Sequence, residues 1–316
     1  MMSFVVRRLF QTVPVILGVT LVTFLLTQIL PGDLADVLLG SAATEESRQQ
    51  LRAALGLDRS LLLQYATYMS HLLSGDLGQS LVFAQPVATV LASRLANTAL
   101  LAVSAIILAS AVGIAIGTFV ALKPESFRDY GLTTAVLFLN SMPPFWLGLI
   151  LILVFGLELR WLPVSGMDSA VGGGGLGDLA AHMVLPTLTL AAWSLAVIAR
   201  MTRSTLLDVI NSDFVRTARS RGLSEARVIL RHTLPNAMPP VITVIGLQAG
   251  FLLSGAVLTE TVFSWPGIGL AMYQGISARD IPFIQGGILL LALIFVLVNF
   301  LVDALYACVN PKIKLQ

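Results

Sequence analysis

Long apolar stretches constrain the fold of this chain more than any other feature. A helix that crosses the hydrocarbon core of a bilayer needs about 20 predominantly apolar residues. Six stretches meet this requirement, approximately at 9–30, 98–122, 132–156, 183–201, 241–259 and 284–308. The first has too long an apolar core for a signal peptide and lacks a small-residue cleavage site, so we interpret it as a span. The sequence therefore predicts an all-α, polytopic membrane protein with six transmembrane helices.

The composition excludes several other classes of protein. Of the 316 residues, 56% are apolar and 11% are charged, against about 45–50% and about 25% in soluble domains. A soluble enzyme, a disordered protein and a disulfide scaffold are therefore poor interpretations. The net charge of +2 gives no reason to expect a nucleic-acid partner. A single cysteine cannot form a disulfide framework or a cysteine-based metal site, and we expect no metal.

The basic residues predict the orientation of the chain in the membrane. With a cytoplasmic N-terminus, 13 Lys and Arg residues fall on the cytoplasmic side and 6 on the outside. Because cytoplasmic loops carry an excess of Lys and Arg, we expect both termini in the cytoplasm. The chain then divides into an N-terminal segment with the first span (1–30), an external helical subdomain (31–97), a five-span core (98–309) with a cytoplasmic loop (200–239), and a cytoplasmic tail (310–316).

The external subdomain carries signals for two helices. Thr44 is expected to cap a helix whose first turn contains Glu45 and Glu46, where the helix dipole favours acidic side chains. Gly56 is expected to end this helix. A second helix is expected over 61–74, with apolar residues on one face.

The loop at 200–239 is the most informative stretch. It contains seven arginines against three acidic residues, a net charge of +4. Residues 213–234 have helical periodicity interrupted at Gly222, which predicts a helix, a glycine turn where a side chain would clash, and a second helix. Ser224 is expected to cap the second helix, and Pro235, Pro239 and Pro240 to end it before the next span. Three interpretations of these arginines are open. They are topology determinants that contact lipid headgroups, they belong to a solvated amphipathic helix without function, or they form a docking element for a cytoplasmic partner.

A resemblance in the same loop favours the docking element. The spacing Ala218-x-x-x-Gly222, followed after eleven residues by Leu234-Pro235, resembles the cytoplasmic EAA loop of ABC-importer permeases. The consensus of that loop is Glu-Ala-Ala-x-x-x-Gly, nine residues, and Ile-x-Leu-Pro. The departures from it are Arg216 and Thr217 in place of Glu and Ala, and His232 in place of Ile.

Other motifs narrow this resemblance to the dipeptide/oligopeptide/nickel-type permeases, and to the first-permease-subunit type among them. Each motif is weak alone, but together they follow in order along nearly the whole chain. They are Leu57-Asp58, Gln64-Tyr65, Gly75-Asp76-Leu77-Gly78 with Ser80, Asn97-Thr98, Trp161-Leu162-Pro163, Arg200 with Arg203, Arg219 with Arg221-Gly222-Leu223, Glu260-Thr261-Val262-Phe263-Ser264-Trp265-Pro266-Gly267, and Asp303 with Tyr306.

The resemblance implies the type I ABC importer permease architecture in a bacterial inner (plasma) membrane. It implies three kinds of protein partner: a second homologous permease of different sequence, two cytoplasmic ABC ATPase subunits that bind ATP-Mg, and an external solute-binding protein. The chain itself lacks a Walker A lysine loop, so we expect neither a bound cofactor nor enzyme activity. The implied ATPase-coupling residues are Arg216, Thr217, Ala218, Arg219, Arg221, Gly222, Leu223, Leu234 and Pro235.

Residues in two other places are candidates for a pathway or an external gate. Pro143 and Pro144 are expected to kink the third span, and Asn140 just before them is a candidate for the pathway. At the outer end of the fifth span, Glu260 is followed by Phe263 and Trp265 in a segment expected to leave the helix. That segment is interpreted either as part of an external gate or as an interfacial aromatic anchor.

Small residues in two spans are suited to close helix packing. Gly113 and Gly117 are spaced as in Gly-x-x-x-Gly, and so are Gly246 and Gly250. Both pairs are interpreted as packing within the chain or as contacts in a pair of permeases.

Three other functional classes remain as alternatives. A secondary transporter typically has inverted repeats and intramembrane ionisable groups, and a membrane-embedded enzyme needs a catalytic pair; the sequence shows neither clearly. A scaffolding subunit would not need the docking loop. We expect the solute to be a dipeptide or oligopeptide, with chelated nickel, glutathione and opines as alternatives within the same class.

Overall fold

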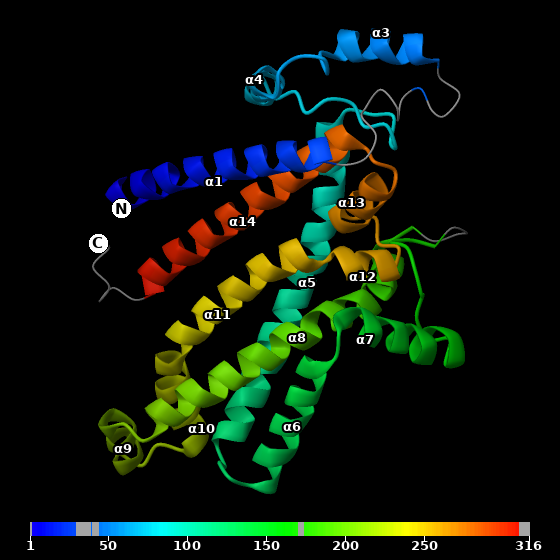
Figure 1. Ribbon diagram of the computed structural model, residues 1–316. Coiled ribbons are helices and arrows are strands. Elements are labelled where there is room, and N and C mark those ends of the chain that lie inside the picture. The colour runs from blue at the N-terminus through cyan, green and yellow to red at the C-terminus, as the bar shows by residue number, and fades with distance from the viewer. Residues whose placement is uncertain (1, 30–38, 40–43, 170–173, 310–316) are drawn as a thin grey trace. The chain divides into compact units, whose positions relative to one another are not determined.

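The computed structural model describes all residues except 1, 30–38, 40–43, 170–173 and 310–316 (Figure 1). The predicted C-terminal tail and the first residues of the predicted external subdomain lie outside the described residues. The described part of the chain is helical and contains no strand beyond an isolated bridge between Gln79 and Pro86. It forms two compact units, one of residues 1–96 and 271–293 and one of residues 97–270 and 294–316.

The described helical segments run from the N-terminal helix α1 to the C-terminal helix α14. In chain order they are α1 (Met2–Ile29), α3 (Glu45–Leu55), α4 (Leu61–Leu73), α5 (Val87–Ala121), α6 (Phe127–Ser141), α7 (Pro144–Leu151), the π-helix η1 (Ile152–Glu158), α8 (Leu176–Ile210), α9 (Asp213–Ser220), α10 (Glu225–Val228), the π-helix η2 (Ile229–Thr233), α11 (Leu234–Gly255), α12 (Val257–Val262), α13 (Ile268–Ser277) and α14 (Ile281–Val309).

The predicted membrane spans correspond to long apolar helical segments. Five segments of the described chain have the length and composition of a span: Thr12–Ile29, Val87–Ala121, Leu176–Ile210, Glu225–Leu253 and Ile281–Val302. The sixth is a bent pair, Phe127–Ser141 and Pro144–Glu158, whose axes meet at 102°. The kink predicted at the two prolines is therefore a complete break. Each residue that precedes a proline there, Met142 and Pro143, is held in an extended conformation, because proline disfavours a helical residue before it.

In the first unit, the predicted helix caps are confirmed. The Thr44 side chain accepts a hydrogen bond from the Ser47 backbone N–H at 3.3 Å, and Gly56 ends α3 in a left-handed conformation with φ of 69°. Aromatic packing joins α1 to α4, since the Phe24 ring centroid lies 5.4 Å from that of Tyr65. The Tyr65 hydroxyl also lies 3.0 Å from that of Thr20.

A second set of contacts in the first unit explains one of the sequence motifs. Gly75 and Gly78 both have positive φ, near 80°, in the turn after α4. Just beyond this turn, the Ser80 hydroxyl donates to the fully buried Asp280 carboxylate at 2.5 Å, and the Val82 backbone N–H donates to it at 3.0 Å. The glycines and Ser80 of this motif thus serve the local fold.

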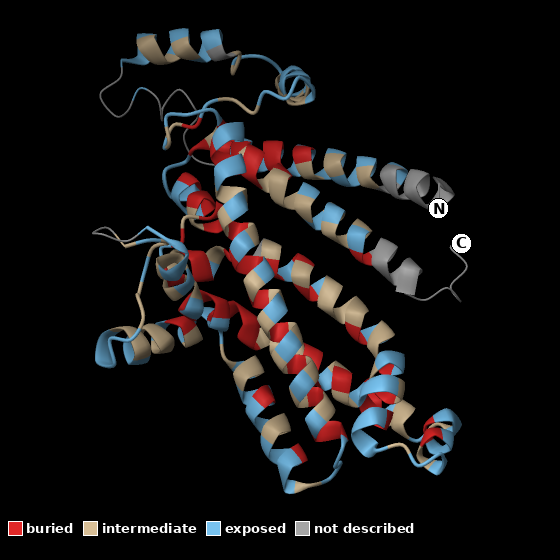
Figure 2. Ribbon diagram, turned by 180° about the vertical axis from the view of Figure 1, so that it is seen from behind, coloured by how far each residue is buried: buried red, intermediate tan, exposed pale blue. Residues whose placement is uncertain are grey.

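In the second unit, α8 is the most buried helix, and α6, α7 and α11 pack against it (Figure 2). The small residues allow close packing between helices of the chain. A Cβ atom on Gly117 of α5 would lie 2.4 Å from the Ala199 carbonyl oxygen of α8, and one on Gly246 of α11 would lie 2.5 Å from Val302 of α14. The interpretation of both Gly-x-x-x-Gly pairs as intrachain packing is confirmed.

Candidate functional site

The predicted docking loop folds as two helices around a glycine turn. α9 ends at Ser220 and Arg221 is its C-cap; Gly222 follows with φ of 75°, its N–H donating to the Arg219 carbonyl at 2.9 Å. A Cβ atom on Gly222 would meet nothing within 4 Å. The expectation that a side chain would clash there is wrong. Glycine is favoured because other residues pay a conformational cost at positive φ.

One face of α9 packs against its own chain. Val215 and Ala218 are buried against Val228 of α10, and Leu223 packs against this cluster. The small side chain of Ala218 therefore lets α9 lie close to α10. Among the predicted coupling residues, Ala218 and Leu223 build the loop rather than face outward.

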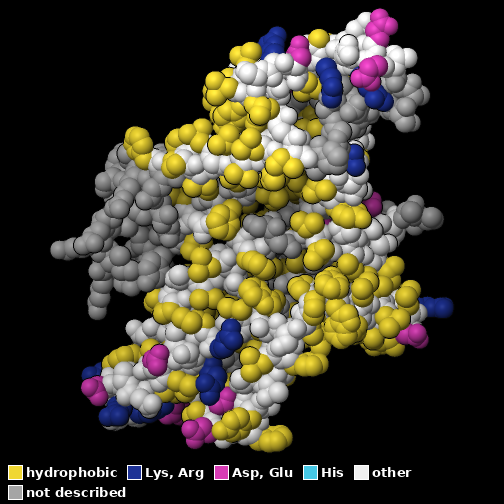
Figure 3. All heavy atoms as spheres, viewed as in Figure 1, with side chains coloured by type: hydrophobic (Ala, Val, Ile, Leu, Met, Phe, Trp, Pro, Cys, Tyr) yellow, Lys and Arg dark blue, Asp and Glu magenta, His cyan; other side chains and the backbone are white. Residues whose placement is uncertain are grey.

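The remainder of α9, with the first turn of α10, is more exposed and carries most of the charge; we call it the α9–α10 surface. It consists of Arg219, which is half-buried, and of five exposed residues, Phe214, Arg216, Thr217, Arg221 and Glu225. Arg219 bridges the two helices, donating to both Glu225 carboxylate oxygens at 2.8 and 3.3 Å. Phe214 places an apolar ring, 47% exposed, among these groups. Figure 3 shows charged side chains gathered over this end of the second unit.

The chain after α10 differs from the prediction. Pro235, Pro239 and Pro240 were expected to end the second helix before the span, but the helical run continues from 225 to 255 through η2. Pro235 lies in the first turn of α11, and the other two prolines lie inside it. The π-helix η2 contains the residues four and five positions before Pro235, whereas Pro239 and Pro240 lie within regular α-helix. The Thr233 hydroxyl donates to the Val228 carbonyl at 3.2 Å.

Ser224 occupies the expected cap position of α10, but its side chain makes no capping hydrogen bond. Leu234, half-buried, begins α11 and packs against the small buried cluster that includes Leu206 and Ala237. The predicted Leu234-Pro235 pair therefore lies at the junction between the loop and a membrane helix.

Glu260 lies at the centre of a buried junction within the second unit. Its side chain is fully buried at the end of α12. It accepts hydrogen bonds from the Thr98 hydroxyl of α5 at 2.7 Å and from the Leu270 backbone N–H of α13 at 3.1 Å. The Thr98 hydroxyl also accepts a bond from the Ile268 N–H at 2.8 Å. We call this set, with Asn97, Phe263 and Trp265, the Glu260 junction.

The two aromatic residues close the same junction. Phe263 is 2% exposed and Trp265 is fully buried. The Trp265 indole N–H donates to the Asn97 carbonyl at 3.0 Å, and the Asn97 side chain donates to the Pro266 carbonyl at 2.8 Å. The segment leaves the helix as expected. The alternative of an interfacial aromatic anchor does not hold, because both rings are enclosed by the protein itself.

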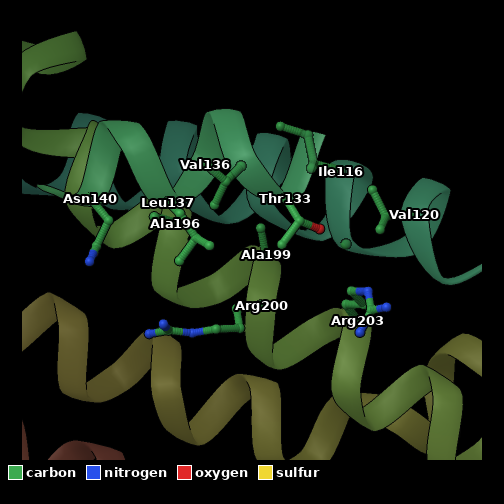
Figure 4. A pocket seen from close by; sticks show the side chains of 11 residues that line it. Ile116, Val120, Thr133, Val136, Leu137, Asn140, Ala196, Ala199, Arg200 and Arg203 are labelled. Atoms are coloured by element: carbon green, nitrogen blue, oxygen red, sulfur yellow. The ribbon is translucent and has the colours of Figure 1, made fainter. Parts of the chain in front are cut away.

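Asn140 lies apart from the Glu260 junction, in the last turn of α6. It lines a pocket of about 210 Å³ between α5, α6 and α8 (Figure 4). The Asn140 Oδ1 atom is buried and has no hydrogen-bond partner. The structure thus places the four predicted pathway or gate residues in two separate sites.

Sequence reasoning missed the role of Asp129 beside this pocket. Asp129 is 3% exposed and accepts two bonds from the Arg203 guanidinium of α8, at 2.9 and 2.6 Å. The signal was present as Ser126-x-x-Asp129, a capping pattern. The Asp129 N–H donates to the Ser126 hydroxyl at 3.3 Å, and the Glu125 N–H donates to the Asp129 carboxylate at 3.0 Å.

Comparison with known proteins gives two family matches. Residues 113–315 match the binding-protein-dependent transport system inner membrane component. Residues 1–102 match the N-terminal part of the membrane component of binding-protein-dependent transport systems. Together the two matches cover nearly the whole chain.

Curated relatives match over essentially their full lengths. The di/tripeptide transport system permease of Pseudomonas aeruginosa (strain UCBPP-PA14) is 44% identical and covers 100% of both chains. The dipeptide transport system permease of Escherichia coli (strain K12) is 43% identical and covers 99% of both. The glutathione transport system permease of Salmonella paratyphi A (strain ATCC 9150 / SARB42) is 42% identical and also covers 99% of both.

Among solved structures, a chain of the methionine ABC transporter MetNI in an inward-facing conformation is similar in fold. The TM-score is 0.56 at 18% identity, and the match covers 70% of this chain and 96% of that one. A second crystal form of the same transporter gives a TM-score of 0.54 at 17% identity.

Proposed function

Because the chain belongs to the family of binding-protein-dependent transport system inner membrane components, we propose that small peptides are the solute it passes across the membrane. The chain is a multi-pass permease subunit of an ABC importer in the inner membrane. Its place in a transport family accounts for the apolar helical segments described above.

The relatives support a peptide as the solute. Permeases named for di/tripeptides, dipeptides and glutathione share 42–44% identity with this chain over its whole length. Glutathione is itself a tripeptide, so the three names have a short peptide backbone in common. Glutathione is the second candidate within this class.

We further infer that the α9–α10 surface docks on an ATPase subunit. A short exposed helix with one aromatic side chain is suited to a groove in a partner. Its arginines are suited to steering an acidic partner surface towards it. The buried Val215–Ala218–Val228 cluster and the Arg219–Glu225 pair support the docking helix. Because the helical run continues from 225 to 255, a displacement of α10 passes directly into a membrane helix.

The proposed assembly contains a second permease of different sequence, two ATPase subunits that bind ATP-Mg, and an external solute-binding protein. This chain has no Walker A lysine loop, so ATP hydrolysis is assigned to the partners. In the proposed orientation, both termini and the α9–α10 surface face the cytoplasm, whereas α3 and α4 face the outside.

We infer different roles for the four pathway candidates. The buried hydrogen bonds of Glu260 and the buried rings of Phe263 and Trp265 suit residues that support the wall of the pathway. Asn140 borders an open pocket and suits a residue that faces the pathway.

Purification of the chain from its native membrane in mild detergent tests the assembly. We expect mass spectrometry to identify a second permease and P-loop ATPases in the same complex. Recovery of the chain alone, under conditions that keep a known ABC importer intact, would favour a secondary transporter.

Uptake by cells that contain the complete system tests the solute. We expect uptake of labelled L-alanyl-L-leucine and competition by other dipeptides. If glutathione competes strongly and dipeptides do not, the second candidate replaces the first. If neither is taken up and nickel uptake depends on the chain, the peptide proposal is wrong.

A further inference from the structure

The pocket beside Asn140 has an apolar interior and a polar rim. Its wall includes Ile116 of α5, Val136 of α6 and Ala196 of α8. At its volume of about 210 Å³ it has room for one large apolar side chain, since a cavity of about 150 Å³ holds benzene. All of its lining residues belong to the second unit.

Two arginines border this pocket, but their charges are not equally available. The Arg203 guanidinium is paired with the Asp129 carboxylate through two hydrogen bonds. Arg200 is exposed, and no described acidic side chain lies within ion-pair distance of it. Figure 4 shows the Arg200 side chain extending toward the end of the pocket where Asn140 lies, with Arg203 at the other end. Arg200 therefore offers an unneutralised cation at one side of the rim.

Asn140 offers a hydrogen-bond acceptor at the same end. Its Oδ1 atom is buried and has no donor partner, although buried polar atoms are normally hydrogen-bonded. The site thus combines an apolar interior, an unneutralised cation and an unsatisfied acceptor. A ligand complementary to all three has an apolar group, an anion and an N–H or O–H donor.

We propose that this pocket holds the C-terminal residue of a peptide in transit, an inference that rests on the proposed peptide solute. The apolar side chain enters the pocket, the terminal carboxylate binds Arg200, and the peptide N–H donates to Asn140 Oδ1. Carboxylate and guanidinium pair well because the planar fork of arginine matches both carboxylate oxygens. The same three features favour peptides that end in an apolar residue with a free carboxylate.

An anionic phospholipid satisfies only part of this site. Its phosphate suits Arg200, and a headgroup hydroxyl, such as those of phosphatidylglycerol, can donate to Asn140 Oδ1. However, a pocket of about 210 Å³ holds only a fraction of an acyl chain, whereas it encloses the whole side chain of a C-terminal leucine. We therefore assign the site to the peptide, and a lipid becomes an outcome of the test.

Photolabelling of the intact importer in nanodiscs tests this assignment without depending on transport activity. The probe is L-alanyl-L-photoleucine, a dipeptide whose C-terminal side chain carries a diazirine, and labelled residues are identified by mass spectrometry. We expect adducts on the pocket wall, at Val136, Ala196 and their neighbours. L-Alanyl-L-leucine should compete for this labelling, and L-alanyl-L-leucinamide, which lacks the carboxylate, should compete at least about tenfold less well.

Three variants distinguish the contribution of Arg200 from that of Asn140 and from nonspecific effects. Arg200→Gln and Asn140→Leu should each reduce labelling of the pocket several-fold, by loss of the cation and of the acceptor. Arg128→Gln is the matched control, because Arg128 is also exposed and belongs to α6 but does not line the pocket. The pocket of this variant should be labelled to the same extent as that of the wild type. Equal labelling of wild type and Arg200→Gln would overturn the proposal.

Two further outcomes are informative. If phosphatidylglycerol in the nanodisc abolishes labelling and native mass spectrometry shows that Arg200→Gln no longer retains this lipid, the pocket is a lipid site and the proposal is wrong. If wild-type cells take up the dipeptide but adducts form only outside the pocket, this inference fails while the proposed function stands. Absence of dipeptide uptake would instead contradict the proposed function.

Discussion

The α9–α10 surface and the Glu260 junction are both built around a short helix and a glycine, but they differ in what surrounds the glycine. Around Gly222 there is open space, and the residue is favoured by its φ of 75°. At Gly267, a Cβ atom would lie 2.3 Å from the Glu260 carboxylate. The first glycine shapes an exposed turn, and the second allows a buried contact.

This difference indicates how each region acts. Apart from Arg219 and Glu225, which pair with each other, the side chains of the α9–α10 surface are exposed, so substitutions there should alter contacts with another subunit. The Glu260 junction is closed by hydrogen bonds inside the second unit, so substitutions there should alter stability first. Thermal stability and the coupling of ATP hydrolysis to transport, measured separately on variants of each region, test this difference.

The largest loss of stability is expected for Glu260→Ala. Removal of the carboxylate leaves the Thr98 hydroxyl and the Leu270 N–H without this acceptor, at about 1–3 kcal/mol for each buried donor. We expect a lower thermal midpoint and less monodisperse protein in size-exclusion chromatography. Glu260→Gln, which keeps an acceptor oxygen, should lower the thermal midpoint less than Glu260→Ala. An unchanged midpoint for Glu260→Ala would show that the junction does not stabilise the fold.

Gly267→Ala should be the next most destabilising. The added methyl group would displace the Glu260 carboxylate, and overpacking of this kind costs about 1–3 kcal/mol. The thermal midpoint of the purified chain is again the measurement. Gly222→Ala is the matched control, and its smaller cost arises only from the left-handed backbone. If the two alanine variants lose equal stability, the contrast between the two glycines is wrong.

In the docking loop, Gly222→Val and Ala218→Arg should abolish transport coupling while membrane insertion stays intact. Valine strains the left-handed turn, and arginine cannot fit among Val215 and Val228. Peptide uptake and ATPase stimulation by the loaded binding protein measure coupling, and membrane fractionation measures insertion. Wild-type uptake by either variant in an intact complex would exclude the proposed role of the loop.

Single arginine substitutions on the α9–α10 surface should have the smallest effects. Arg216 is 70% exposed and lies 3.8 Å from Asp213; exposed ion pairs contribute about 0.2–1 kcal/mol. Arg216→Ala should therefore weaken ATPase binding only slightly, and less so at high salt. Binding measured across a potassium chloride series checks this expectation, and a large loss that is independent of salt would point to a buried contact instead.

The sequence predicted those structural features that depend only on residues close to one another along the chain, such as helix caps and turns. Thr44 caps the start of α3 and Gly56 ends it, as predicted. Both features depend only on residues within one helical turn. The glycine turn at Gly222 was also predicted, although the assigned cause was wrong. The bend at Pro143 and Pro144 was expected as a kink, but its angle of 102° depends on how α7 packs against α8 and α12.

Contacts between distant residues were not predictable in the same way. Glu260 meets Thr98 across 162 positions of the chain, and Asp129 meets Arg203 across 74. No periodicity links such residues, and their side chains gave no sign of which would be buried. The prolines at 239 and 240 were expected to end a helix, but they lie inside α11, since packing against neighbouring helices can stabilise a helix that contains prolines.

The sequence alone was sufficient to predict a helical membrane protein, the segments long and apolar enough to span the bilayer, and the position of the proposed docking loop. It could do so because long apolar runs, caps and glycine turns act over short distances along the chain. The folded structure was needed to show that Ala218 faces inward, that the side chains of the Glu260 junction are buried and hydrogen-bonded, and that Asn140 and Arg200 border one pocket. Those outcomes depend on burial between helices that are far apart in sequence, and burial determines which polar groups find partners inside the protein.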